Sequence, residues 1–73
     1  MVYFDGVHLL ADTLDELHSA AKSLGLKPSW FQGEASHPHY DCFGSIAERA
    51  GKKYGVLKPT EMLRQYLAAK EKA

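Results

Sequence analysis

The sequence predicts a small α+β domain, in which a short sheet is packed by two or three helices. Three observations predict this class. Two short apolar runs flank an Asp-Gly turn near the N-terminus, a helix-capping pattern with apolar residues at helical spacing follows, and a second capping pattern occurs later in the chain. A chain of 73 residues has room for one hydrophobic core, so residues 1–73 are expected to form a single domain.

The predicted sheet begins with an N-terminal hairpin. Residues 1–4 and 7–11 are rich in β-branched, aromatic and aliphatic side chains, and Gly6 between them accepts the positive φ of a tight turn. The aromatic segment 29–32, which contains the only tryptophan, predicts a third strand. It would lie beside the second strand either in a parallel β-α-β unit or antiparallel to it. The segment 33–41 is rich in turn-forming residues and predicts an ordered loop.

The first helix is the best-defined element. Thr13 and Glu16 form a capping box that satisfies free amides at the helix start, and Gly25 is a suitable residue to end the helix. The apolar face is expected to consist of Leu14, Leu17, Ala21 and Leu24.

Two further helices are predicted. Ser45 with Glu48 forms a second capping box, and the helix that follows would end at Gly55. A last helix begins near Lys58-Pro59. Its apolar side is expected to consist of Leu63, Tyr66 and Leu67.

The composition favours a folded protein in a reducing compartment. Hydrophobic residues make up 45% of the chain, and the single cysteine, Cys42, excludes an internal disulfide. The N-terminal residues do not resemble a signal peptide, and no segment is long and apolar enough to span a membrane, so a cytoplasmic location without a membrane partner is expected. So small a chain buries only about 60% of its unfolded surface. A homo-oligomer is therefore expected.

Charge is balanced overall but unevenly distributed. Residues 1–44 carry two basic and six acidic side chains, a net charge of −4, and residues 45–73 carry seven basic and three acidic ones, a net charge of +4. The two halves could attract each other within one fold or between protomers, and the basic part could face a small anionic ligand. The bias is too weak for a protein that binds duplex nucleic acid.

The segment 36–43, Ser-His-Pro-His-Tyr-Asp-Cys-Phe, has the highest density of side chains that can bind a ligand or take part in catalysis. If it is extended, His37, His39 and Asp41 share a face, with the ligand types and spacing of a transition-metal site. The alternatives are a contact to phosphate or nucleotide, and a loop whose histidines form local hydrogen bonds. Short H-x-H strings are common, so the loop is the preferred interpretation and no metal is assigned. Cys42 follows an acidic residue and is expected to be buried and inert.

Four residues outside this segment are candidate ligand contacts. His8 on a predicted strand and His18 on the first helix are interpreted as core or boundary histidines, unless the fold brings them to His39. Trp30 is interpreted first as a core anchor and second as a platform on which a base could stack. Gln32 would share a strand face with Trp30, and its amide could bond to a ligand.

An anion site is expected where the second helix begins. Backbone amides and the helix dipole at Ser45 favour negative charge, and Gly44 leaves space for close approach. Arg49 can hold a phosphate with two hydrogen bonds, although a solvated helix face is the ordinary interpretation of this arginine. With His39 and Tyr40, these groups would hold a phosphorylated small molecule.

Three motifs occur in the order of a known pattern: HLLADTLDELHSAAKSLGL, WFQ and HPHYD. With them the chain resembles an uncharacterised bacterial and phage family, the domain of unknown function 4031, over about residues 1–55. The resemblance assigns the polar positions of the family to His8, Asp12, Thr13, Glu16, His18, Trp30, Gln32, His39, Tyr40 and Asp41, with Arg49 and Gly55 matching more loosely.

The chain departs from this pattern in two places. The family often has a longer insertion where this chain has only Asp5-Gly6, and His37 is not a firm part of the pattern. The family name carries no activity. Its occurrence in phages implies an accessory or anti-defence role as a hypothesis.

The preferred function is a non-catalytic binding module for a phosphorylated or nucleotide-like small molecule, in a phage setting one that sequesters a host signalling nucleotide. The expected ligand contacts are His8, His18, Trp30, Gln32, His39, Tyr40, Asp41, Ser45 and Arg49. One alternative is a small phosphodiester hydrolase, which depends on a metal or uses His39 as general base with Asp41 orienting it. Another is a protein-interaction module that uses the basic C-terminal helix. No cofactor is expected, and the sequence leaves open whether the protein is an enzyme.

Overall fold

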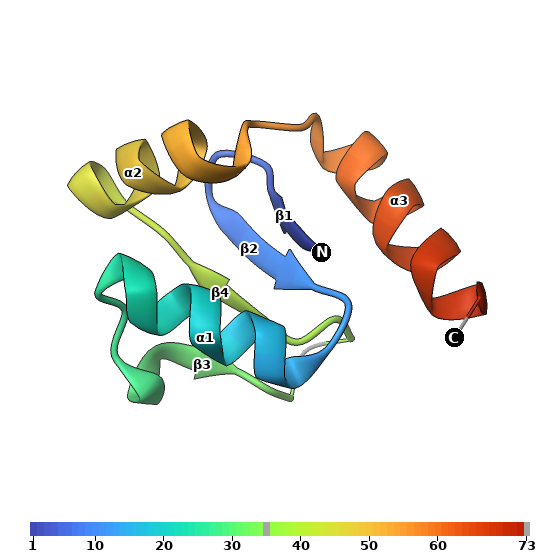
Figure 1. Ribbon diagram of the computed structural model, residues 1–73, viewed down its shortest axis with the longest axis horizontal. Helices are drawn as coiled ribbons and strands as arrows, with labels where there is room; N and C mark the ends of the chain where they lie inside the picture. Colours follow the sequence, from blue (N-terminus) through green and yellow to red (C-terminus); the bar gives the residue numbers. More distant parts are fainter. Residues whose placement is uncertain (35, 73) are drawn as a thin grey trace.

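The fold is a four-stranded sheet packed by three α-helices, in a computed structural model that describes residues 1–34 and 36–72 (Figure 1). The strand order is β1-β2-β4-β3, and each neighbouring pair is antiparallel. The predicted α+β class is therefore confirmed.

The strands are short: β1 is Val2–Phe4, β2 is His8–Ala11, β3 is Phe31–Gln32 and β4 is His39–Asp41. β1 and β2 form the predicted hairpin, although its turn includes Val7 as well as the Asp-Gly pair. Asp5 shapes this turn. Its carboxylate accepts hydrogen bonds from the amides of Val7 at 2.9 Å and His8 at 2.6 Å. An aspartate that binds its own backbone two or three residues on is a common way to fix a turn.

Helix α1, Leu14–Leu24, has the predicted caps. The Thr13 hydroxyl accepts a hydrogen bond from the amide of Glu16 at 3.2 Å, and Gly25 ends the helix at a φ of 86°. The buried residues are Leu17, Ala20, Ala21 and Leu24. Leu14, expected on this face, is 52% exposed because the stripe that meets the sheet begins one turn later.

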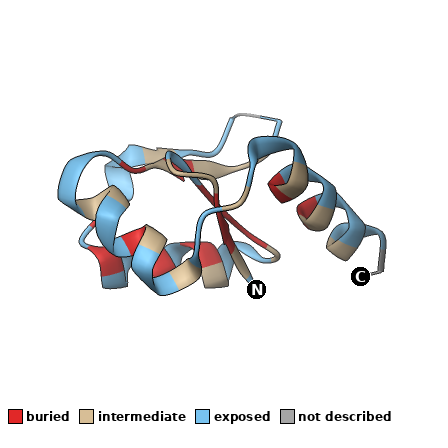
Figure 2. Ribbon diagram, turned by 90° about the horizontal axis from the view of Figure 1, so that it is seen from above, coloured by how far each residue is buried: buried red, intermediate tan, exposed pale blue. Residues whose placement is uncertain are grey.

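One face of the sheet is covered by α1 and α2, Gly44–Tyr54. The buried residues of these helices lie on the sides of the ribbons turned toward the sheet (Figure 2). Phe4, Leu9 and Tyr40 are the largest fully buried side chains of the strands on this face. The principal core therefore lies between the sheet and these two helices.

The other face is covered only in part, by α3, Pro59–Lys72. Met62 and Tyr66 of this helix pack with Tyr3 and Leu10 of the first two strands. Contact through one narrow stripe explains why Leu63 and Leu67, expected on the apolar side of the helix, remain exposed. Strands β3 and β4 have no helix from this smaller core over them, which leaves their part of the face available for a site.

The third and fourth strands differ from the prediction. Trp30 lies in a short 3-10 helix, Pro28–Trp30, because proline fixes a φ suited to a helical first turn. The strand therefore begins at Phe31 and pairs antiparallel with β4, so the parallel β-α-β alternative is wrong. Residues 39–41, expected in a loop, form β4 because pairing on both sides and burial of Tyr40 override the local turn signals.

The start of α2 also differs from the prediction. The N-cap residue is Phe43, with no side-chain cap, and the chain enters the helix at Gly44 with a φ of 58°. Ser45 therefore lies within the first turn and does not cap the helix. The helix ends as predicted, at Gly55.

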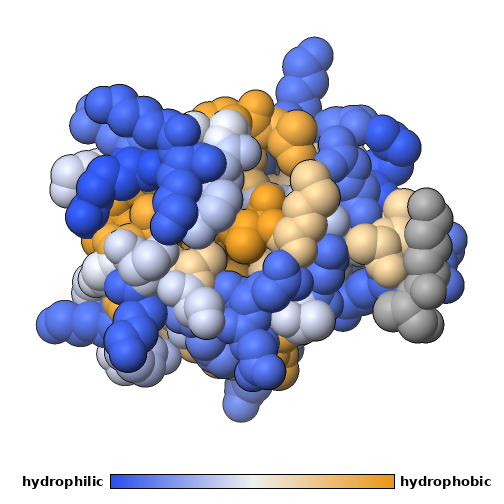
Figure 3. Space-filling view, in the orientation of Figure 1, coloured by the Kyte–Doolittle hydropathy of each residue, from blue (hydrophilic) through white to orange (hydrophobic). Residues whose placement is uncertain are grey.

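Several large apolar side chains remain at the surface. On the face shown in Figure 3, apolar patches are interrupted by hydrophilic side chains. Trp30 is 43% exposed, so its preferred interpretation as a core anchor is wrong, and Phe43 is 69% exposed. Among the described residues, no helix combines the length and apolarity needed to cross a membrane.

Mutation of the two predicted capping residues, Thr13 and Ser45, should change the stability of the protein by different amounts. Thr13→Ala removes an observed cap bond and should lower the free energy of unfolding by about 1 kcal/mol. The matched Ser45→Ala change removes no cap bond and should stay within about 0.5 kcal/mol of wild type. Urea unfolding followed by circular dichroism measures both variants. Equal losses would contradict the helix start described for α2.

Candidate functional site

The candidate site arises because successive side chains of β4 point to opposite faces of the sheet. Tyr40 points into the principal core, so His39 and Asp41 on either side of it point to the opposite face of the sheet. The register of β2 with β4 places His8 directly opposite Asp41. His8, which is distant in the sequence, is thereby brought onto the same face as His39 and Asp41.

These three residues, here called the histidine–aspartate cluster, lie close enough to share one ligand. Oδ1 of Asp41 lies 3.3 Å from Nε2 of His39 and 3.8 Å from Nε2 of His8. The two imidazole rings meet edge to face with centroids 5.3 Å apart. One potential ligand atom from each residue lies within 4.8 Å of the others. The arrangement thus has the dimensions of a small coordination site.

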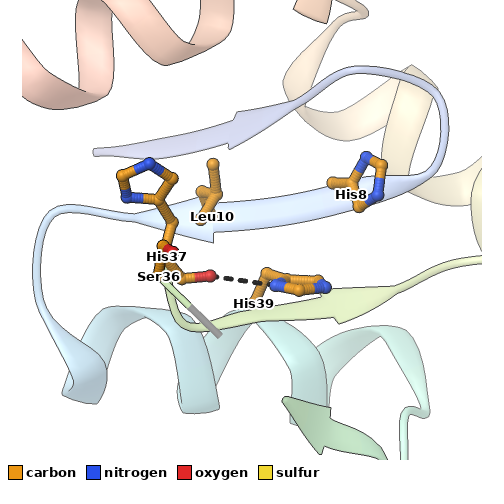
Figure 4. Close-up of a pocket in the computed structure, with 5 residues that line it drawn as sticks. All are labelled: His8, Leu10, Ser36, His37 and His39. Carbon is orange, nitrogen blue, oxygen red and sulfur yellow. Dashed lines mark hydrogen bonds between the residues drawn. The ribbon is translucent and has the colours of Figure 1, made fainter. Parts of the chain in front are cut away.

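The other ring nitrogen of each histidine is held by a hydrogen-bond acceptor. Nδ1 of His8 lies 2.9 Å from the Asp5 carboxylate, and Nδ1 of His39 lies 2.9 Å from the backbone carbonyl oxygen of His37 (Figure 4). Since a carbonyl or carboxylate oxygen only accepts, we assign the proton of each neutral ring to Nδ1. Both Nε2 atoms therefore present lone pairs toward Asp41.

Asp5 is well suited to orient His8. Its side chain is only 5% exposed. Burial by itself raises the pKa of Asp5. The hydrogen bonds from the amide and the ring of His8 and from the amide of Val7 outweigh this effect, so the pKa of Asp5 lies below its usual value. Asp5 is therefore an ionised acceptor at neutral pH, which keeps the Nδ1 proton of His8 in place.

When both imidazole rings are neutral, the carboxylate at the centre of the cluster has no positive partner among the described residues. Oδ1 of Asp41 is buried and has no hydrogen-bond donor among the described residues. It faces two nitrogen lone pairs, so three acceptors point into one small space. A buried acceptor without a partner costs about 1–3 kcal/mol, and more when it is charged. A cation in this space would relieve the cost.

The donor set fits a divalent transition-metal ion. Two histidine nitrogens and one carboxylate form a ligand set used by iron and zinc sites with open coordination positions. Ligand atoms around tetrahedral zinc lie about 3.3 Å apart, given zinc–ligand distances of about 2.0–2.2 Å. The two separations at Asp41 are close to this value. The separation of 3.8 Å at His8 is the longer of the two, and a small shift of this ring, which is 50% exposed, would complete the geometry while its bond to Asp5 is kept.

Two recesses flank the cluster. One, of about 250 Å³, is lined by His8 and His39 together with Leu10, Ser36 and His37 (Figure 4). The other, of about 320 Å³, is lined by Asp41 together with Trp30, Gln32 and Phe43 among others. We call the second recess the aromatic groove. The cluster thus stands at the junction of two hollows large enough to admit a small molecule.

His18 and Tyr40 belong to the opposite face of the sheet. The Tyr40 hydroxyl lies 2.7 Å from Nδ1 of His18, and the His18 ring packs edge to face with Phe31 at 4.7 Å. Burial raises the pKa of Tyr40, so its hydroxyl stays protonated and can donate to the imidazole. Of the three histidines whose positions the sequence left open, only His8 and His39 converge.

The predicted anion site does not come together around the cluster. The Arg49 guanidinium donates to the carbonyl of Leu24 at 2.9 Å and so closes the end of α1. Ser45 is exposed in the first turn of α2. His37 points away from the cluster in Figure 4 and packs edge to face with Tyr66, with centroids 5.4 Å apart. His8 therefore takes the place that the linear motif predicts for His37.

The neighbouring cysteine is buried, as predicted. Burial, together with the nearby carboxylates of Asp41 and Asp5, raises the pKa of the Cys42 thiol to about 11. Cys42 as a whole is 1% exposed. A protonated, inaccessible thiol is neither a nucleophile nor a metal ligand at neutral pH.

Two residues of the site were missed by the sequence analysis. Asp5 was interpreted only as part of a turn, and Phe43 was not considered as a ligand contact. The signal for Asp5 was its position three residues before His8 in a tight hairpin, since such a turn lets an aspartate reach the start of the next strand. No sequence signal indicated Phe43.

The chain matches, over residues 5–56, the family described as protein of unknown function (DUF4031), and it belongs to that family. The resemblance drawn from the sequence motifs is thereby confirmed. Comparisons with curated proteins and with solved structures gave no match.

The assigned tautomers are testable by imidazole nitrogen NMR. At a pH where the rings are neutral and in the presence of chelator, His8 and His39 should carry their proton on Nδ1, because an acceptor lies 2.9 Å from each. Asp5→Asn should change the ring signals of His8 and leave those of His39 unchanged. Protons on Nε2 of both rings in the wild-type protein would contradict the assignment.

Proposed function

We propose that this member of the family binds a divalent transition-metal ion through His8, His39 and Asp41, and uses it to hold a small phosphorylated ligand. The observation that carries the proposal is the buried, unpartnered Oδ1 of Asp41, which faces the two Nε2 atoms at 3.3 and 3.8 Å. The sequence also favours a module that binds a phosphorylated small molecule. The proposal differs from it because a metal ion, instead of protein groups alone, contacts the phosphate.

A metal accounts for the cluster better than a proton does. A proton on His39 would give Asp41 one partner, but the Nε2 atom of His8 would still present its lone pair to the same space. A divalent ion would take one ligand atom from each of the three residues. The contacts at Nδ1 agree with this role, because metal-binding histidines usually donate their other N–H to a carboxylate or a backbone carbonyl.

Three protein ligands leave at least one coordination position open. The position lies on the partly uncovered face of the sheet, beside the two recesses, and a phosphate oxygen is a suitable fourth ligand. The metal would also balance the negative charge of Asp41. Phosphate binding here requires neither the start of α2 nor Arg49.

Hydrolysis of a phosphodiester is a second candidate, favoured by the same open position. A metal held by His8, His39 and Asp41 would supply Lewis-acid activation of water for attack on phosphorus. The new P–O bond would form as the bond to the leaving alcohol breaks, and the proton would pass to the leaving oxygen. Turnover of a chromogenic phosphodiester by the metal-loaded protein, absent after chelation, would favour this function over simple binding.

Metal titration tests the proposal. We expect wild-type protein, stripped with chelator, to bind Zn²⁺ or Co²⁺ with one ion per chain in isothermal titration calorimetry. His8→Ala and His39→Ala should each weaken binding by more than the roughly 10- to 100-fold typical of losing an outer-shell partner. The matched control is His37→Ala, which belongs to the linear motif but points elsewhere and should bind as wild type does.

Two results would contradict the proposal. One is the absence of heat above dilution for wild-type protein that is folded by circular dichroism. The other is an equal loss of affinity in His37→Ala and His39→Ala, which would indicate a loop site instead of a site formed between β2 and β4.

Asp41→Asn separates metal binding from structural support. The amide keeps the shape, removes the unpartnered charge and can donate to one of the Nε2 lone pairs. In chelator, this variant should be at least as stable as wild type in urea unfolding. With saturating Zn²⁺ only the wild type should gain stability, by about 2.7 kcal/mol at 100 times the Kd. A loss of more than about 1 kcal/mol in chelator would indicate a structural ion pair.

A further inference from the structure

Two aromatic rings line the aromatic groove and remain outside both cores. Trp30 is 43% exposed and Phe43 is 69% exposed. They come from different segments, the short 3-10 helix before β3 and the connection between β4 and α2. Large aromatic side chains usually supply much of the buried area of a small core. Two exposed rings on one groove therefore suggest a role in binding a flat apolar surface.

The groove begins at the proposed metal. Asp41 is both a wall of the groove and a member of the histidine–aspartate cluster. Gln32 also lines the groove and pairs with His39 in the ladder between β3 and β4, so it projects from the same face of the sheet. Its amide offers donors and an acceptor, the groups that can bond to the edge of a base.

We propose that the aromatic groove binds the base of a nucleoside monophosphate whose phosphate coordinates the metal. The proposal rests on the metal function proposed above and names the class of ligand. The base stacks against Trp30 and Phe43, its edge lies within reach of Gln32, and the sugar passes over Asp41. The volume of about 320 Å³ is at the lower end of the range of about 300–1,000 Å³ for small-molecule sites.

Charge in and around the groove favours this ligand. A divalent ion with Asp41 gives a local charge of +1, and Lys27 adds a cation 5.6 Å from the centroid of the Trp30 ring. A phosphate monoester carries roughly −1.5 to −2 at neutral pH. The metal end of the site is therefore matched to phosphate, whereas the aromatic end, where Lys27 lies over the Trp30 ring, is matched to a base.

The single tryptophan makes the test direct, because it lines the groove itself. Full-length protein loaded with Zn²⁺ would be titrated with adenosine monophosphate, cytidine monophosphate and ribose 5-phosphate, with tryptophan fluorescence and calorimetry as readouts. Stacking of one base is worth about 1–3 kcal/mol, or about 5- to 150-fold in affinity. We expect at least one mononucleotide to bind about 10-fold or more tightly than ribose 5-phosphate and to quench the fluorescence.

Phe43→Ala should remove much of this advantage. The side chain is 69% exposed, so its loss should leave the fold and the metal affinity unchanged. The affinity for the mononucleotide should fall about 5-fold or more, toward that for ribose 5-phosphate, which should itself be unaffected. The matched control is Val56→Ala, an exposed apolar side chain that does not line the groove and should change neither affinity.

The outcomes separate this inference from the metal proposal. Equal binding of mononucleotides and ribose 5-phosphate by metal-loaded protein would overturn the groove assignment and leave the metal site intact. Absence of metal binding would overturn the metal site and, with it, the inference that rests on it. Mononucleotide binding that chelator does not weaken would overturn the arrangement in which the metal and the groove hold one ligand. A change in native mass with Phe43→Ala, without any change in mononucleotide affinity, would identify the groove as a contact between copies of the chain and refute the inference.

Discussion

The antiparallel pairing of β2 with β4 is the constraint on which the rest of the site depends. Tyr40 must point into the core because its ring is almost completely buried and its hydroxyl meets His18 at 2.7 Å. Alternation then sends His39 and Asp41 to the other face, and the register sets His8 opposite Asp41. A slip of one residue would turn both polar side chains into the core and Tyr40 out of it. The same interaction that closes the core therefore positions the cluster.

The cluster departs from what stability alone would favour. A domain of this kind has a free energy of unfolding of about 5–15 kcal/mol, and an unpartnered buried acceptor costs about 1–3 kcal/mol of it. Replacement of Asp41 by an apolar residue would remove the cost of its unpartnered oxygen. Apolar residues at His8 and Asp41 would also suit a sheet face that is covered by a helix. The polar groups are instead held in place by Asp5 and by the carbonyl of His37. A buried polar group without a partner is typical of residues kept for binding or chemistry.

The sequence predicted the elements whose signals are local. The capping residue Thr13 and the terminal glycine of α1 act through contacts within one turn, and both were identified correctly. Ser45 and Glu48 have the same spacing but form no cap. The backbone enters α2 one residue earlier, at Gly44 with a positive φ, and the N-cap position is occupied by Phe43. Sequence spacing could not distinguish these two cases.

The site was harder to predict because it depends on strand register. The linear motif brought His39 and Asp41 together correctly, since they share one strand. Its third expected member, His37, turned toward Tyr66, and the histidine that completes the cluster comes from a strand about thirty residues earlier. Pairing between short strands is decided by burial across the whole sheet, which no local pattern records. For the same reason the sequence could not separate His8 from His18, although the two lie on opposite faces.

A metal would explain how a chain of zero net charge could recognise phosphate without an arginine in the site. Arg49, the side chain best suited to that task, is bound to the carbonyl of Leu24. An ion held by His8, His39 and Asp41 would supply concentrated positive charge on the uncovered part of the sheet, where the aromatic groove begins. All of these residues lie within the range matched by the family, 5–56, whereas α3 lies beyond it and packs against β1 and β2. The proposed binding surface therefore depends on the part of the fold that the family match covers, and α3 contributes only to the smaller core beside it.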